Sequence, residues 1–242
     1  QQFWWVNPYA PDLGRIGPAD FFARILENDR RYLGDHLPVL LLGLEGRLLL
    51  PFGIALAVLA TLGWAARLRR PGVAEFFLPL YAGLLLAWPP VWSGERFLLP
   101  ILPILLANAG EALTRMARRI GPRAAHWAAP GAACLLLAAG LPALAAGVQI
   151  GTTCTRLYLR GEPYACLTQE WRDFFELAEW SRRALPDGAV VLSRKPRLFY
   201  VLSGHRGRNY PLSREPAAFV EAVRASGARY LVLDYTDQIS GL

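Results

Sequence analysis

Four long apolar stretches, each free of charged side chains, constrain the fold of this chain more than any other feature. They cover residues 48–66, 76–94, 97–110 and 127–155 of the 242-residue chain. A helix needs about 20 apolar residues to cross the ~30 Å hydrocarbon layer of a membrane. The first, second and fourth stretches are long enough, and the third approaches that length if its helix continues past Glu111. We therefore predict an α-helical membrane bundle of about four transmembrane helices, at residues 48–66, 74–94, 97–113 and 128–150.

Arginine clusters predict the direction in which these helices cross. Seven arginines follow the first and third stretches: Arg67, Arg69, Arg70, Arg115, Arg118, Arg119 and Arg123. The turn between the second and third stretches carries only Glu95 and Arg96 as charged residues. Because cytoplasmic loops of membrane proteins are enriched in Lys and Arg, we expect both arginine loops in the cytoplasm. The Glu95–Arg96 turn and both ends of the chain then lie on the outer side.

Composition divides the chain into three parts. Residues 1–47 are predicted to form an extracytoplasmic loop with an amphipathic interfacial helix, residues 48–150 the transmembrane region, and residues 151–242 a small extracytoplasmic domain. A hydrophobic content of 54% is too high for an ordinary soluble protein. The net charge of +7 does not indicate nucleic-acid binding, because seven arginines lie in two loops where membrane orientation explains them.

The polar start of the chain contains one amphipathic segment. Pro18 suits the first turn of a helix, and five apolar residues follow near helical spacing: Phe21, Phe22, Ile25, Leu26 and Leu33. Such a helix either lies in the membrane interface or packs on the outer domain, and the sequence favours neither. Residues 37–50 are apolar apart from Glu45 and Arg47, and they predict a re-entrant or interfacial lead-in to the first span. Arg47 is expected to extend toward the headgroups.

Beyond residue 150 the pattern changes to an alternation of helices and strands. Residues 170–185, 197–202 and 215–226 have the apolar spacing and end signals of helices. Residues 189–193 and 229–234 are short runs typical of buried strands. Helices and strands that alternate with short connections predict a small α/β domain with a short parallel sheet.

Two of the three cysteines fall in this predicted outer domain. Cys154 and Cys166 are twelve residues apart, and such a pair forms a disulfide in an oxidising compartment. The alternative is two free thiols whose spacing is accidental. Cys134 lies in an apolar stretch and is interpreted as inert packing. Because the chain has no C-x-x-C motif and no Cys/His cluster, we expect neither a metal site nor a cofactor.

The segment from Glu95 to Pro103 is the strongest local pattern that could carry chemistry. An acid–arginine pair stands at the outer end of a span, and Pro100 and Pro103 follow in its first turns. Prolines remove backbone donors and expose polar backbone at the membrane interface. An arginine at this position can hold a lipid phosphate by a planar, two-pronged contact while the lipid tail stays in the bilayer. The alternative is that Arg96 only anchors the helix among the headgroups.

Residues 96–103, which read Arg-Phe-Leu-Leu-Pro-Ile-Leu-Pro, resemble the bacterial GT-C glycosyltransferases of family 39. These are relatives of the protein O-mannosyltransferases and of the lipid A aminoarabinose transferase. Residues 171–191, 194–204 and 227–234 extend the resemblance into the extracytoplasmic C-terminal domain of that family. The resemblance covers nearly the whole chain but only the later part of a full-length enzyme, so we expect this chain to be a fragment.

The resemblance implies sugar transfer at the outer face of the bacterial inner membrane by a multi-pass protein. The donor is a polyprenyl-phosphate-linked sugar, an acceptor hydroxyl attacks its anomeric carbon with inversion, and the lipid phosphate leaves. Arg96 is then the candidate for binding the donor phosphate, and Glu95 is the candidate for orienting Arg96. A basic cluster follows a predicted strand and consists of Arg194, Lys195 and Arg197. It is a candidate for contact with lipid headgroups or with an anionic acceptor. The alternative is that it lies on a solvated loop.

The catalytic residue stays unknown at this point. In the family, the carboxylate that activates the acceptor follows the first span, in a loop that this sequence does not contain. Asp12, Asp20 and Asp35 lie in outer segments, but they are interpreted as turn or helix-end residues. We therefore expect this chain to be inactive on its own.

One rival hypothesis is a non-catalytic subunit or scaffold of a larger membrane complex, derived from such a transferase. A transporter fragment is less favoured, because the spans contain almost no ionisable side chains. The expected partners are the lipid bilayer, the polyprenyl-phosphate sugar donor and other membrane subunits, and no nucleic acid.

Overall fold

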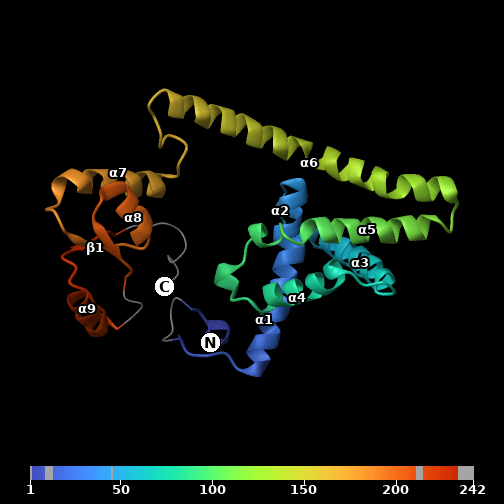
Figure 1. The fold of residues 1–242 in the computed structure, drawn as a ribbon, viewed down its shortest axis with the longest axis horizontal. Coiled ribbons are helices and arrows are strands. Elements are labelled where there is room, and N and C mark those ends of the chain that lie inside the picture. The colour runs from blue at the N-terminus through green and yellow to red at the C-terminus, as the bar shows by residue number, and fades with distance from the viewer. Residues whose placement is uncertain (1, 9–12, 45, 211–214, 234–242) are drawn as a thin grey trace. The chain divides into compact units, whose positions relative to one another are not determined.

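The computed structural model describes residues 2–8, 13–44, 46–210 and 215–233, and it is mostly helical with one small parallel sheet. The chain forms two compact units (Figure 1). The first contains Ile16–Gln149 together with the N-terminal residues up to Trp4. The second contains Trp5–Arg15 and the chain from Ile150 onward. Each unit is described separately below.

The first unit begins with one long helical run. It consists of α1 (Pro18–Arg31), a π-helical segment (Tyr32–His36) and α2 (Leu37–Leu42). Asp20 caps its start by accepting a hydrogen bond of 3.0 Å from the Gly17 N–H, which is the expected helix-end role for this residue. At the π-helical segment the Leu37 N–H bonds to the Tyr32 carbonyl, five residues back. Pro38 follows and has no N–H to donate, which accounts for the local change in helical pitch.

This run extends the predicted amphipathic helix through residues 37–42. The helix packs on α4 (Val73–Ala87) of the same unit. Glu45 lies outside the described residues.

The centre of the first unit is the contact between α3 (Leu50–Arg67) and α5 (Leu102–Ala117). The buried face of α3 consists of Gly53, Leu56, Ala60 and Gly63, which recur at three- and four-residue intervals. A Cβ at Gly63 would lie 1.8 Å from the Asn108 carbonyl oxygen, so only glycine permits this approach of the two helices. Small residues at helix crossings are typical of packing inside membranes.

The prolines shorten two of the expected spans. The helix predicted at 74–94 ends at Ala87, because Trp88 is extended before Pro89 and Pro90. The helix predicted at 97–113 begins only at Leu102, after Pro100, and runs on to Ala117. Short 3₁₀ turns, Pro90–Trp92 and Glu95–Phe97, connect the two helices. The predicted C-terminal end of the second helix and the predicted N-terminal end of the third are therefore wrong.

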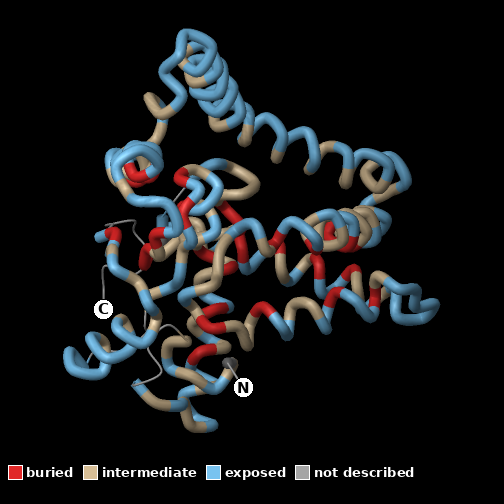
Figure 2. Tube along the Cα trace, turned by 60° about the vertical axis from the view of Figure 1, so that its left-hand side comes forward, coloured by how far each residue is buried: buried red, intermediate tan, exposed pale blue. Residues whose placement is uncertain are grey.

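Within the described residues, α3 and α6 (Pro122–Leu159) are long and apolar enough to cross a membrane, and α4 is a shorter apolar helix. The 38 residues of α6 correspond to about 57 Å of helix. None of its residues is buried, and Figure 2 shows mostly exposed positions along it. The helix continues for nine residues beyond residue 150, the predicted end of the span, to Leu159.

The second unit is a small α/β domain, as predicted. Its sheet has the order β2-β1-β3, and β1 (Val190–Leu192) pairs in parallel with both β2 (Arg206–Arg208) and β3 (Tyr230–Leu231). The helices are α7 (Gln169–Ala184), α8 (Pro196–Ser203) and α9 (Pro216–Ala225). The core contains Phe174, Ala178, Val191, Phe199 and Val232, which come from α7, β1, α8 and the segment after β3.

The loop between α6 and α7 is tied by covalent and polar contacts. Cys154 and Cys166 form a disulfide with a Cα–Cα distance of 5.7 Å. Tyr164, inside this loop, donates a hydrogen bond to Glu179 on α7. That bond raises the pKa of Tyr164 to about 12, because ionisation would place a phenolate against a carboxylate.

Candidate functional site

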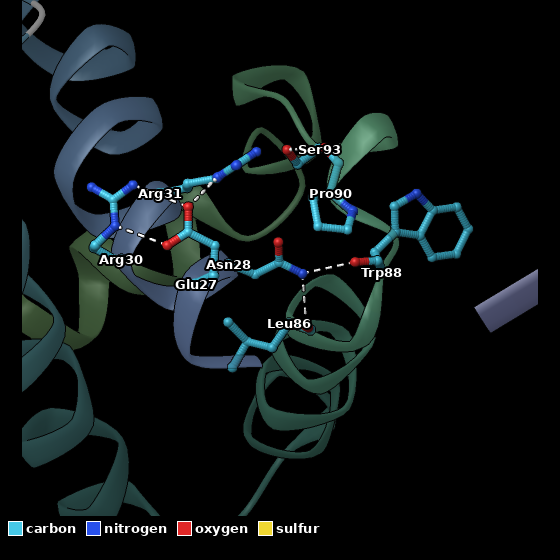
Figure 3. A network of polar contacts seen from close by, with 8 residues as sticks. All are labelled: Glu27, Asn28, Arg30, Arg31, Leu86, Trp88, Pro90 and Ser93. Carbon is cyan, nitrogen blue, oxygen red and sulfur yellow. Dashed lines mark hydrogen bonds and ion pairs between the residues drawn. The ribbon is translucent and has the colours of Figure 1, made fainter. Parts of the chain in front are cut away.

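The turn between α4 and α5, residues 88–101, is held against the end of α1 by one buried side chain. Asn28 is 0% exposed and donates from Nδ2 to the Leu86 carbonyl at 2.8 Å and to the Trp88 carbonyl at 2.7 Å (Figure 3). These carbonyls lie at the C-terminal end of α4, where the helix leaves its last acceptors without internal partners. Asn28 therefore fixes the place where the turn begins.

A cluster of charges lies beside Asn28 on α1. Glu27 forms ion pairs with Arg30 at 3.0 Å and with Arg31 at 2.7 Å (Figure 3). The hydrogen bond from Arg30 and then that from Arg31 lower the pKa of Glu27 to about 2. Two arginines share the Glu27 carboxylate here, and Asp29 on the same helical turn supplies a second carboxyl group.

The two residues of the acid–arginine motif point to different partners. Arg96 is exposed, and its guanidinium carbon lies 4.9 Å from the centre of the Phe97 ring. The Glu95 carboxylate lies 3.7 Å from His36 Nδ1. Glu95 thus faces the π-helical segment, and the described ion pairs do not include one between Glu95 and Arg96.

His36 and Tyr32 are parts of this site that sequence reasoning missed. Burial lowers the pKa of His36, although the nearby Glu95 opposes the shift. The two rings lie 5.1 Å apart, and the Tyr32 hydroxyl lies near the backbone of Gly94 in the turn. The available sequence signal is Pro38, because a proline inside a helix often marks a local change in pitch.

An apolar cavity of about 310 Å³ lies between the α1–α2 run, α3, α4 and residues 98–105. Leu98, Ile101 and Leu105 line it from the segment that carries Arg96. Asp29, Tyr32, Thr61 and Trp64 provide its few polar side chains. Residues 96–105 therefore present an exposed cation at one end and line an apolar cavity further on.

This arrangement suits an amphiphile with an anionic headgroup. A guanidinium binds phosphate oxygens through two parallel hydrogen bonds, and an apolar cavity accepts part of a hydrocarbon tail. Among the nearby acids, Asp29 lines the cavity and burial raises its pKa, whereas Glu95 faces His36 and Asp20 caps α1. Asp35 is half-buried inside the π-helical segment, so its expected turn or helix-end position is wrong, and Asp12 lies outside the described residues. The described part of the chain shows no group of three or more metal-binding side chains.

The second predicted cluster lies in the other compact unit. Arg194, Lys195 and Arg197 follow the carboxyl end of β1 and lead into α8. Lys195 Nζ lies 5.8 Å from the centre of the Trp171 ring, a cation–π contact that adds an aromatic side chain to the cluster. Arg197 is exposed, whereas Arg194 and Lys195 are half-buried.

The comparisons with known proteins identify no relative. No family model, no curated protein and no solved structure matches this chain.

Proposed function

We propose that this chain is part of a membrane glycosyltransferase of the GT-C type, which transfers a sugar from a polyprenyl-phosphate donor to an acceptor. One observation carries the proposal: exposed Arg96 is followed within the same segment by Leu98, Ile101 and Leu105, which line an apolar cavity. A phosphate joined to an isoprenoid tail needs a cation and an apolar cavity close together. The resemblance of residues 96–103 to family 39 supports the same substrate class.

In this proposal Arg96 binds the phosphate that links the sugar to the lipid. The acceptor oxygen forms a bond to the anomeric carbon, and the bond from that carbon to the phosphate oxygen breaks. The phosphate takes the bonding electron pair, and Arg96 stabilises the added charge. The acceptor proton passes to a carboxylate, which the resemblance places in a loop outside this sequence.

The membrane arrangement is part of the proposal. Helices α3 and α6 are apolar and long enough to span a bilayer, and α4 and α5 pack with α3 in the same unit. We place the arginine loops in the cytoplasm of a bacterium, and the Arg96 turn and the α/β domain on the outer side of the inner membrane. In that orientation Arg96 meets the donor at the outer headgroups.

A second candidate is a subunit that binds the lipid phosphate without transferring sugar. The positions of two nearby acids favour it: Glu95 faces His36, and Asp20 is engaged as a helix cap. A subunit of this kind binds the same ligand but shows no turnover.

The test is binding of farnesyl phosphate to the purified chain in detergent, with farnesol as the uncharged comparison. We expect the Arg96→Ala variant to lose at least tenfold in affinity for farnesyl phosphate, since a charge-assisted pair contributes on the order of 1.5–3 kcal/mol. Its affinity for farnesol should not change. The Arg96→Lys variant should recover part of the loss, because lysine keeps the charge but not the two-pronged geometry.

Arg70→Ala is the matched control, since Arg70 is an exposed arginine in the loop after α3. Equal losses in the Arg70 and Arg96 variants would indicate charge screening and would refute the phosphate site. Transfer of sugar in native membranes, measured with the same variants, separates the two candidates. Normal phosphate binding with no Arg96-dependent transfer would favour the non-catalytic subunit.

A further inference from the structure

A second apolar hollow lies in the first unit, and one of its ends lies toward the arginine loop between α5 and α6. It is a groove of about 1040 Å³ between α3, α5 and α6, with Leu41 of α2 at one end. Helix α6 forms one wall, and it touches its neighbours through small residues. A Cβ at Gly110 of α5 would meet Ala129 of α6 at 3.3 Å, and a Cβ at Gly140 would meet the Leu41 carbonyl at 2.9 Å. Between these two contacts the helices separate and the groove remains open.

The lining of the groove is almost entirely hydrocarbon. On α6 it runs from Ala129 to Leu144, fifteen residue steps or about 22 Å of helix. That exceeds the thickness of one membrane leaflet, which is about half of the ~30 Å hydrocarbon layer. The polar side chains in the lining are Glu111 and Thr114, and both lie toward the arginine loop between α5 and α6.

Unbalanced positive charge lies at this end of the groove. Glu111 pairs with Arg115 at 2.6 Å. Over the part of the chain that the structure describes, no acidic side chain forms an ion pair with Arg118, Arg119 or Arg123. All three are exposed, beside exposed Ile120.

Two of these arginines lie on the groove side of their helices. Arg118 comes four residues after Thr114, so it lies one turn further along the same face of α5. Arg123 comes seven residues before Pro130, two turns earlier on the same face of α6. The groove therefore ends between two cations supplied by different helices.

We propose that this groove binds one acyl chain of an anionic phospholipid, with the lipid phosphate held by Arg118 and Arg123. The ligand comes from the leaflet that faces the arginine loops, so the site differs from the Arg96 site. The apolar lining fits an acyl chain, and the groove is long enough to take a chain that reaches across one leaflet. Unpaired arginines at one end fit a negative headgroup, as in basic pockets between transmembrane helices. This inference requires a membrane-embedded chain but does not depend on sugar transfer.

The experiment uses the full chain in phosphatidylcholine vesicles doped with phosphatidylglycerol that carries a diazirine on one acyl chain. After irradiation, crosslinked peptides are mapped and compared with those from a phosphatidylcholine diazirine probe. We expect the phosphatidylglycerol probe to label residues 106–114 and 129–144 preferentially. Double replacement R118Q/R123Q should lower that labelling about fivefold or more for each arginine removed, and should leave the phosphatidylcholine pattern unchanged.

Two matched variants distinguish lipid binding in the groove from general lipid contact along α6. Ala133→Phe fills the groove, because Ala133 lines it and is exposed. Ala138→Phe places the same side chain on α6 at an exposed position outside the lining. The first should abolish groove labelling and the second should preserve it.

Three results would overturn the proposal. One is uniform labelling along α6, which is the pattern of ordinary surrounding lipid. Another is equal labelling by the two probes, which would exclude headgroup recognition. The third is groove crosslinks to a second protein chain in place of lipid, which would show that the groove is a protein interface.

Discussion

Replacing Asn28 by alanine is expected to destabilise the first unit and to loosen the turn that carries Arg96. The side chain is fully buried and donates to the Leu86 and Trp88 carbonyls, which lie 58 and 60 residues away in the sequence. Alanine keeps the helix propensity of α1 high, so the change tests these two hydrogen bonds and not the helix itself.

The magnitude follows from the atoms involved. A partly buried carbonyl left without a donor costs about 1.5 kcal/mol, so two carbonyls cost about 3 kcal/mol. Asn28 Oδ1 is buried and has no hydrogen-bond partner among the described residues. Removing this atom therefore relieves a desolvation penalty on the order of 1 kcal/mol. The expected net loss is therefore about 2 kcal/mol in the free energy of unfolding, or roughly a 30-fold change in the folding equilibrium.

The assay is reversible unfolding in mixed micelles with increasing SDS, followed by tryptophan fluorescence. Leu26→Ala is the control, because Leu26 lies on the same helix and is 71% exposed. Asn28→Asp gives a sharper test, since an ionised carboxylate faces two carbonyl oxygens and cannot donate. Its loss should be larger at pH 8 than at pH 5, where a protonated carboxyl can donate one hydrogen bond.

The reasoning would be refuted by an Asn28→Ala variant whose unfolding free energy stays within about 0.5 kcal/mol of the parent, the usual range for surface changes. An Asn28→Asp variant insensitive to pH would refute the assigned hydrogen bonds even if stability fell.

Two further predictions concern the packing and the pH response of the first unit. Gly63→Ala should cost about 1–3 kcal/mol in the same assay, because its Cβ would lie 1.8 Å from the Asn108 oxygen. Gly83→Ala, with no neighbouring atom within 4 Å of its Cβ, should be close to neutral; equal effects would contradict the α3–α5 contact. Burial lowers the pKa of His36 below 6.5, so the unfolded chain binds its proton first. Stability should therefore fall as pH drops below about 6.5, by at most about 1.4 kcal/mol per pH unit. This slope should disappear in His36→Gln, and an unchanged slope would show that other groups titrate.

Much of the local structure is encoded in the sequence over short distances. The helix at 48–66 was recognised because uninterrupted apolar residues leave few alternatives, and α3 covers nearly the same residues. The parallel sheet was recognised because helices and strands alternate with short connections, and β1 and β3 form where expected. The errors in the predicted ends of the second and third spans also have a local cause. The predicted ends followed the long apolar stretches and gave too little weight to the prolines, which end helices.

Other features depend on the tertiary structure because their partners are distant in the sequence. Strand β2 reads Arg206-Gly207-Arg208 and has no apolar pattern, yet it pairs with β1. Gly207 permits this arrangement, since a Cβ there would lie 2.5 Å from the Pro196 carbonyl oxygen. A sequence pattern contains no signal for a close approach of this kind.

The candidate site likewise has one part that the sequence identifies and another that only the folded chain provides. The sequence identified Arg96 and the prolines of its turn, because a cation at the outer end of an apolar stretch is a local pattern. Only the folded chain brings Asn28, Tyr32 and His36 to that turn and forms the apolar cavity from four separate segments. Periodicity and composition act over a few helical turns, whereas buried hydrogen bonds and cavities depend on which distant surfaces meet. The sequence alone therefore determined the cation and its position at the end of an apolar segment, and the tertiary structure decided which side chains surround it.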